Sequence, residues 1–147
     1  MNDLRDLYQQ LILDHNKSPR NFGVLEGANR SAQGYNPLCG DEINVSALLG
    51  SDIIEAIKFE GAGCAISKAS ASIMTTVVKG KTVQEARVII ERFHRMATTG
   101  EMNGQDMGKL AALADIHKYP ARVKCAMLAW RTLSASLEQQ PTLVSTE

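Results

Sequence analysis

Two segments of alternating apolar and polar residues, separated by a short polar turn, restrict the folds open to this chain. The first alternates over residues 43–49 and the second over residues 53–60. Period-two alternation is typical of half-buried strands, and Gly50-Ser51-Asp52 between them is typical of a tight turn. We therefore expect a β-hairpin, which a strand at residues 30–35 extends to a three-stranded antiparallel meander. A sheet this small needs cover on one face.

Helices predicted on both sides of this hairpin can supply that cover. Apolar residues recur at helical spacing in four segments, and a shorter helix is expected between the third and the fourth. Thr82-Val83-Gln84-Glu85 has the pattern of a capping box, and Pro120 suits the first turn of the last helix. The expected fold class is α+β, a three-stranded antiparallel sheet covered on one face by α-helices. The expected helices are 3–15, 64–79, 83–98, about 106–117 and 120–138.

The length of 147 residues predicts one domain with a core of its own. We place this domain at residues 1–138. Residues 139–147 contain Pro141 and few apolar side chains, so they are expected to form a flexible tail.

Composition excludes several classes of function. The 16 basic and 16 acidic residues balance, so neither nucleic acid nor an anionic membrane should attract this chain. No apolar run approaches the ~20 residues of a membrane span, and no signal-peptide pattern is present. We expect a cytoplasmic protein, where thiols stay reduced or bind metal.

The three cysteines each follow a predicted structural event. Cys39 lies on a turn with the sequence Asn-Pro-Leu-Cys-Gly-Asp, Cys64 at a strand-to-helix junction, and Cys125 in the second turn of the last helix. With Asp41, they offer the four ligands of a tetrahedral zinc site. Cys39 could instead be an ordinary thiol beside a turn-forming aspartate, and Cys125 a small buried hydrophobe.

Arg122 precedes Cys125 by three residues, which places both on one face of a helix. It could stabilise negative charge on the thiol or contact an incoming anion, or it could form a surface salt bridge.

Other polar residues receive structural interpretations. His15 ends the apolar stripe of the first helix, where a surface position is favoured over a ligand role. His117 is interpreted as a cap or surface residue. Ser67, Ser70 and Ser72 are interpreted as small packing residues, because no base is spaced to activate them.

The sequences around the three cysteines closely resemble the cysteine motifs of the IscU/NifU-type iron–sulfur assembly proteins. The resemblance extends from the first helix to about residue 138. Its motifs are Asn-Pro-Leu-Cys-Gly-Asp at 36–41, Gly-Ala-Gly-Cys-Ala-Ile-Ser at 61–67 and Arg-Val-Lys-Cys-Ala at 122–126.

The sequence departs from the Isc-type pattern at three places, and in these features it resembles the SufU branch of this family. Lys124 stands where Isc-type scaffolds have a histidine. Tyr-Pro-Ala-Arg-Val-Lys at 119–124 replaces the Leu-Pro-Pro-Val-Lys segment that a dedicated Hsp70 chaperone reads. The segment between Cys64 and Cys125 is also longer, with the extra residues around 100–117.

The resemblance implies a zinc-dependent sulfurtransferase that works in iron–sulfur cluster biogenesis. Its implied partners are a PLP-dependent cysteine desulfurase of the Suf system and a downstream Suf scaffold. We predict Cys39 as the sulfur acceptor because Pro37 and Gly40 flank it, whereas helices anchor the other two cysteines. Arg122 would steady the thiolate or persulfide. The implied zinc ligands are Cys39, Asp41, Cys64 and Cys125.

Two other functions remain open. The same ligands could hold iron or a transient [2Fe–2S] cluster on a scaffold protein, although Lys124 is a poor replacement for a histidine ligand. Alternatively, the chain could be a non-catalytic, zinc-stabilised interaction module.

Overall fold

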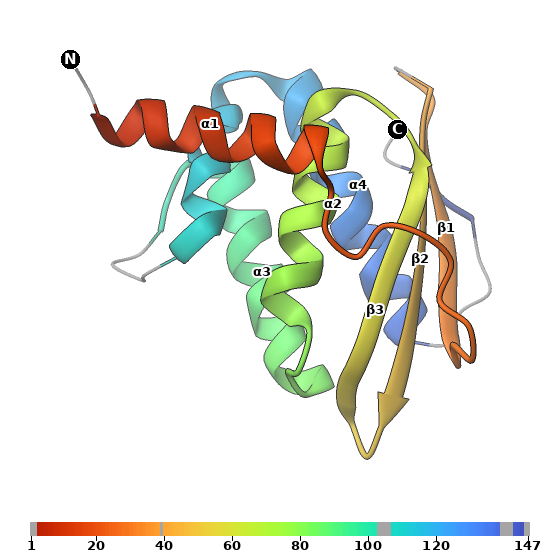
Figure 1. The fold of residues 1–147 in the computed structure, drawn as a ribbon. Helices are drawn as coiled ribbons and strands as arrows, with labels where there is room; N and C mark the ends of the chain where they lie inside the picture. Colours follow the sequence, from red (N-terminus) through yellow and green to blue (C-terminus); the bar gives the residue numbers. More distant parts are fainter. Residues whose placement is uncertain (1–2, 39, 103–106, 139–142, 146–147) are drawn as a thin grey trace.

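The computed structural model describes residues 3–38, 40–102, 107–138 and 143–145, and packs helices on one face of a single sheet (Figure 1). This arrangement confirms the predicted α+β class. The elements in chain order are α1 (Asp3–Lys17), β1 (Arg30–Asn36), β2 (Asp41–Gly50), β3 (Ile53–Ala62), α2 (Ala65–Val78), α3 (Val83–Thr99), the 3-10 helix η1 (Gly108–Lys118), α4 (Pro120–Leu137) and β4 (Leu143–Ser145).

The predicted antiparallel meander β1–β2–β3 makes up most of the sheet, with β2 between the other two strands. Alternate residues of β2 are buried, as the sequence pattern predicts. The β2–β3 turn contains Ser51 and Asp52, whose φ angles are 51° and 70°. Two successive positive φ angles give a type I′ turn, which matches the twist of a tight hairpin. Ser51 and Asp52 thus adopt the backbone conformation that this turn requires.

A short fourth strand differs from the sequence prediction. Strand β4 pairs in parallel with β1, with Gln33 opposite Leu143 and Tyr35 opposite Ser145. The sequence predicts a flexible tail over 139–147, of which 139–142 and 146–147 lie outside the described residues. Leu143 and Val144 suit a strand, and the outer side of β1 offers them unpaired backbone groups.

The opposite edge of the sheet is partly covered by the segment that follows α1. The Phe59 N–H donates to the Asn21 carbonyl oxygen at 3.0 Å, and the Gly23 N–H donates to the Phe59 carbonyl oxygen at 2.8 Å. The Phe22 ring lies edge-on to the Phe59 ring, with their centroids 5.2 Å apart. Backbone and aromatic contacts therefore fix this segment against β3.

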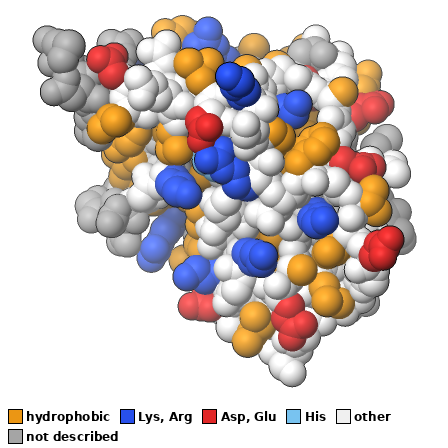
Figure 2. All heavy atoms as spheres, viewed as in Figure 1, with side chains coloured by type: hydrophobic (Ala, Val, Ile, Leu, Met, Phe, Trp, Pro, Cys, Tyr) orange, Lys and Arg blue, Asp and Glu red, His pale blue; other side chains and the backbone are white. Residues whose placement is uncertain are grey.

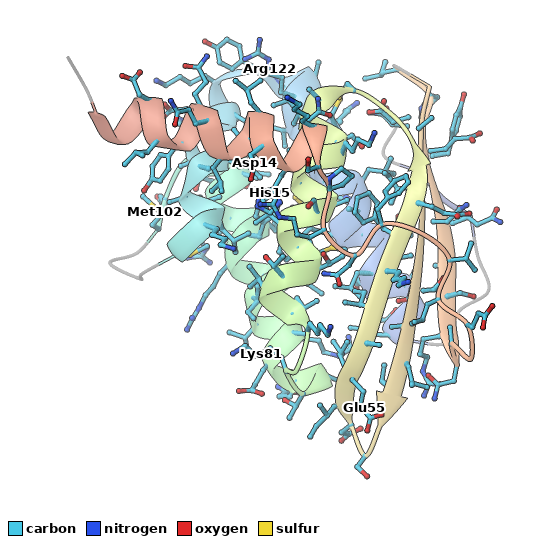
Figure 3. The ribbon with its side chains drawn as sticks, viewed as in Figure 1. Asp14, His15, Glu55, Lys81, Met102 and Arg122 are labelled. Carbon is cyan, nitrogen blue, oxygen red and sulfur yellow. The ribbon has the colours of Figure 1, made fainter. Side chains whose placement is uncertain are left out.

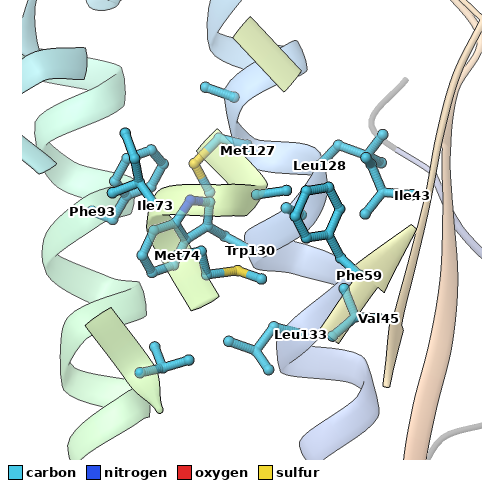
Figure 4. Packing of buried hydrophobic residues seen from close by; sticks show 14 of the residues in the cluster. Ile43, Val45, Phe59, Ile73, Met74, Phe93, Met127, Leu128, Trp130 and Leu133 are labelled. Atoms are coloured by element: carbon cyan, nitrogen blue, oxygen red, sulfur yellow. The ribbon is translucent and has the colours of Figure 1, made fainter. Parts of the chain in front are cut away.

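The hydrophobic core lies between the sheet and the helices. In Figure 4 the packed side chains run from Phe93 on α3 across Trp130 on α4 to Phe59 and Val45 on the sheet. The Phe93 and Trp130 rings are stacked with centroids 4.3 Å apart, and both are fully buried. Each large apolar side chain buried in this way contributes roughly 1.5–3 kcal/mol.

Serine side chains link α2 to this core. The Ser70 hydroxyl donates to the Ala126 carbonyl oxygen at 2.7 Å and accepts the Trp130 indole N–H at 3.0 Å. The hydroxyl thus joins α2 to α4 and satisfies the one polar side-chain atom of the buried tryptophan.

The helix before α4 is a 3-10 helix, although an α-helix was expected at about 106–117. It begins at Gly108, and residues 103–106 lie outside the described residues. Leu110, Leu113 and Ile116 are its large buried residues, and they are three positions apart. A 3-10 helix has three residues per turn, so this spacing aligns all three on one face.

His15 does not lie on the surface, and the sequence interpretation of this residue was wrong. Its side chain is fully buried, with Nδ1 2.7 Å from the Ser72 hydroxyl oxygen. The same oxygen accepts the Arg20 backbone N–H at 2.8 Å. His15 follows Ile12 and Leu11 at helical spacing, so it continues the inward stripe of α1. In Figure 3 it is labelled where α1 crosses α2.

The surface has no single dominant charge on the face seen in Figure 2. Lys and Arg side chains lie there among acidic, hydrophobic and other residues. Within the described part of the chain, no helix is both long enough and apolar enough to cross a bilayer. That the protein does not bind nucleic acid stays a prediction.

Candidate metal centre

The structure brings three of the four predicted ligands together. Ligand atoms of Asp41, Cys64 and Cys125 all lie within 4.8 Å of one another. They come from the first residue of β2, the residue before α2 and the second turn of α4. Cys39 lies outside the described residues, between Leu38 and Gly40. Segments far apart in the sequence thus converge at one point.

Asp41 is buried and is oriented by the start of α2. One carboxylate oxygen, Oδ1, accepts the Cys64 backbone N–H at 2.9 Å, and the other, Oδ2, lies 3.6 Å from the Cys64 sulfur. A Cβ atom at Gly63 would lie 3.0 Å from Oδ1. Such contacts are very tight, so the glycine gives the carboxylate its place beside the cysteine.

Cys64 is the N-cap residue of α2. Its backbone is extended, with φ −70° and ψ 169°, and its sulfur accepts the Ser67 backbone N–H at 3.4 Å. The unpaired N–H groups and the dipole at a helix N-terminus favour negative charge at this position. The sulfur is therefore held where a metal-bound thiolate would be stabilised.

Cys125 is largely buried on α4, where Asn36 contacts it. The Asn36 side-chain N–H donates to the Cys125 sulfur, with 3.7 Å between Nδ2 and Sγ. Sequence analysis did not single out Asn36, although it opens the motif that contains Cys39. The available signal was an asparagine at the start of the predicted ligand-bearing turn.

The turn that contains Cys39 is closed by Asn36 as well. The Gly40 N–H donates to the Asn36 carbonyl oxygen at 2.8 Å, and the Leu38 N–H donates to the side-chain oxygen of Asn36 at 3.1 Å. Gly40 has a φ of 71°, which a residue with a side chain rarely adopts. The side chain of Leu38 is exposed. The turn thus lies at the surface beside the three clustered ligands.

Arg122 lies at the start of α4 and is exposed to solvent, at the edge of the molecule in Figure 3. Its guanidinium carbon lies 4.6 Å from the centroid of the half-exposed Tyr119 ring. This cation–π contact restricts the side chain without removing its charge from solvent. The predicted role of Arg122 toward Cys125 stays a prediction.

The donor set fits zinc. Zinc binds thiolate sulfur and carboxylate oxygen in tetrahedral geometry, with two bound sulfurs about 3.8 Å apart for Zn–S bonds of about 2.3 Å. The observed cluster, within 4.8 Å, needs only a small contraction to reach this spacing. Asp41 and Cys125 are buried and Cys64 is partly buried, so the three groups could hold a metal ion away from bulk solvent. Cys39 could supply the fourth ligand.

These features define a small α+β protein with a candidate cysteine–aspartate metal centre at one end of its sheet. Residues 7–136 match the NifU-like N-terminal domain. The chain is 42% identical over 139 residues to the zinc-dependent sulfurtransferase SufU of Bacillus subtilis (strain 168), covering 94% of each chain. It is 38% identical over 140 residues to the iron–sulfur cluster assembly scaffold protein IscU of Streptococcus pyogenes serotype M1, covering 95% of this chain and 87% of that one.

A solved structure shows the same fold. It is described as a candidate iron–sulfur cluster assembly scaffold protein for the SUF system, from Fervidobacterium islandicum AW-1. The TM-score is 0.83 at 37% sequence identity, covering 90% of this chain and 98% of that one. The chain belongs to the NifU-like N-terminal domain family of iron–sulfur cluster assembly proteins.

Proposed function

We propose that this protein is a zinc-dependent sulfurtransferase of iron–sulfur cluster biogenesis. It would accept sulfur on Cys39 from a PLP-dependent cysteine desulfurase of the Suf system and pass it to a downstream Suf scaffold. The likeness to SufU over nearly the whole of both chains supports this proposal. The observation that carries it is the cluster of Asp41, Cys64 and Cys125 beside the surface turn that contains Cys39.

The four proposed ligands, which are Cys39, Asp41, Cys64 and Cys125, fall into two groups. Cys64 is the N-cap residue of α2 and Cys125 lies in α4. The sulfur of each accepts a hydrogen bond. Cys39, which is outside the described residues, lies in the chain between Leu38 and Gly40, both of them exposed. Zinc would keep the thiols deprotonated, which is the form in which sulfur is nucleophilic. The helix-anchored ligands would retain the metal, and Cys39 would carry the chemistry.

The transfer step is a thiol exchange. The Cys39 thiolate attacks the outer sulfur of the desulfurase persulfide, so a new S–S bond forms on Cys39. The donor's S–S bond breaks, and the desulfurase cysteine leaves as a thiolate. One persulfide is consumed and one is made, so the step needs no oxidant or reductant.

Arg122 is proposed to steady the negative charge of the Cys39 thiolate or persulfide. It lies one helical turn before Cys125 and keeps its charge exposed while it stacks on Tyr119. The control variant is Arg95→Ala, which removes an exposed arginine from α3. If Arg122→Ala transferred sulfur as fast as Arg95→Ala, with zinc still bound, Arg122 would have no role in transfer.

The test of the proposal is sulfur transfer itself. Protein with one zinc per chain should stimulate alanine formation from cysteine by the desulfurase and should acquire a persulfide on Cys39. Cys39→Ala should abolish both effects. The control is Glu55→Gln at the opposite end of the sheet, which should behave as wild type (Figure 3). Full stimulation by Cys39→Ala would contradict the proposal. A wild-type protein that binds zinc but never stimulates the desulfurase would be an interaction module.

A scaffold for a transient [2Fe–2S] cluster is the second candidate function. Cysteine thiolates are the usual ligands of such clusters, and the IscU relative is named as an assembly scaffold. Elemental analysis beside a visible spectrum, on protein purified anaerobically without added metal, separates the two functions. About one zinc per chain without visible absorbance supports sulfur transfer. Iron with sulfide and visible charge-transfer bands supports the scaffold.

A further inference from the structure

We infer that Asn36 is a positioning residue of the metal centre, which holds the Cys125 sulfur and the Cys39 turn in a fixed relation. This inference rests on the proposed function, since it assumes that these cysteines bind metal. It is argued from three contacts of one fully buried side chain and its backbone.

Each half of the Asn36 amide has a separate task. The N–H group donates to the Cys125 sulfur across 89 residues of sequence. The oxygen accepts the Leu38 N–H, and the Asn36 backbone oxygen accepts the Gly40 N–H. One residue therefore connects α4 to both sides of the turn that contains Cys39.

The close packing of β1 on α4 makes this contact possible. Gly34 precedes Asn36 by two positions, so both face the helices. A Cβ atom at Gly34 would collide with the Thr132 hydroxyl oxygen and lie 3.0 Å from a Leu128 methyl carbon. The missing side chain lets α4 lie close enough to β1 for a short amide to reach Cys125.

The chemistry of this hydrogen bond suits a metal-bound thiolate. An N–H donor lowers the cost of negative charge on a buried sulfur, and it directs the remaining lone pairs of that sulfur. An asparagine provides the donor without adding charge of its own. A leucine of similar size would fill the space but would leave both the sulfur and the Leu38 N–H without this partner.

Asn36→Asp separates the two tasks of the amide. It keeps an oxygen for the Leu38 N–H and replaces the donor to Cys125 with a carboxylate oxygen, so it also adds negative charge beside the sulfur, which Asn36→Ala does not. Gln33→Glu is the matched control, because it makes the same chemical change on the exposed face of the same strand. Asn36→Ala removes both side-chain contacts and tests the role if the aspartate variant does not fold.

The readouts are zinc affinity by chelator competition, the sulfur-to-cobalt charge-transfer band of the Co²⁺-substituted protein, and the unfolding of the metal-free protein. We expect Asn36→Asp to bind zinc about 10- to 100-fold more weakly, as other losses of hydrogen bonds to metal ligands do. The charge-transfer band should shift, because it reports charge on the bound sulfur. Gln33→Glu should match wild type in both measurements.

Unchanged affinity and an unchanged band in the Asn36 variants would overturn the inference. So would weaker binding that is accompanied by an unshifted band and a less stable metal-free protein, because a purely structural role predicts that result. A wild-type chain that binds neither zinc nor cobalt would instead refute the proposed function. The two failures are therefore distinguishable.

Discussion

The two ends of the sheet are held by different kinds of interaction. At the hairpin end, which comprises residues 50–55 and 80–85, backbone groups dominate. The Val83 N–H donates to the Asp52 carbonyl oxygen and the Ile54 N–H to the Lys81 carbonyl oxygen, both at 2.8 Å. At the site end, which comprises Asn36 to Asp41 with Cys64 and Cys125, side chains join segments distant in sequence. The hairpin end can form without a ligand, whereas the site end gathers groups that a metal would hold together.

Metal removal should produce the largest difference between the two ends. Zinc present at a thousand times its Kd stabilises a folded protein by about 4 kcal/mol. Stripping it should therefore lower the Tm clearly. Hydrogen exchange should accelerate at Cys64 and in the first turns of α2 and α4, while β2–β3 amides near Ser51 keep their relative protection. An unchanged Tm would mean that no metal joins these elements.

Gly34→Ala should weaken the site end without removing any ligand. The added methyl group meets Thr132 and Leu128 on α4. Overpacking of this kind costs roughly 1–3 kcal/mol, and here it should also separate Asn36 from Cys125. We expect a lower urea midpoint together with weaker zinc binding. Loss of stability with unchanged zinc affinity would show that the spacing of β1 and α4 does not determine the site.

Thr82→Ala tests the hairpin end alone. Thr82 and Glu85 form a complete capping box at the start of α3, with both bonds between 2.9 and 3.0 Å. Loss of such a cap costs about 1 kcal/mol. Urea unfolding should show this loss while zinc affinity stays at the wild-type value. A parallel loss of zinc affinity would contradict the independence of the two ends.

The smallest expected effect is a pH dependence carried by a single imidazole. Burial lowers the pKa of His15 below its usual value, and the charges of Arg20 and Lys109 lower it further, while Asp14 opposes them. As the pH falls below ~6.5, the imidazole of His15 therefore binds a proton more readily in the unfolded state than in the folded state. This contribution to stability is complete above that pH and is lost as the pH falls toward the lowered pKa.

Urea midpoints of metal-free protein at pH 7.5 and 5.5 measure this effect, and His15→Gln should reduce the difference between them. The metal-free protein is needed because zinc ligands also bind protons. Equal pH dependence in wild type and variant would mean that protonation of His15 does not destabilise the contact between α1 and α2.

Local pattern was sufficient for much of the fold. The alternation of β2 and β3, the turn at Ser51 and Asp52, and the capping box at Thr82 each depend on neighbouring residues, and each was confirmed. The 3-10 geometry of η1 was missed, although the spacing of its buried residues favours it. Strand β4 was missed because three residues form a strand only when an edge is available to them.

The sequence could indicate three candidate ligands that lie together in the structure, but it could not indicate the contacts that hold them in place. Asp41, Cys64 and Cys125 could be chosen from residue type and from their positions at element ends. The hydrogen bonds from Asn36 to Cys125 and between His15 and Ser72 could not be predicted from the sequence, because they link residues 89 and 57 positions apart. Such pairings depend on how α1, α2 and α4 pack, which local periodicity does not specify.

Strand β4 also changes the exposed edge of the sheet. Exposed outer strands allow proteins to join sheet to sheet and aggregate. Here β4 occupies β1 from Gln33 to Tyr35, and the segment from Asn21 to Gly23 pairs with β3 at Phe59. The chain's own segments thus cover part of β1 and part of β3, and the strand left at the outside next to β1 is β4, which is three residues long. Because short edge strands offer few backbone groups to another chain, we expect the sheet to resist pairing with other copies of itself, while the turn after β1 stays exposed at Leu38 and Gly40.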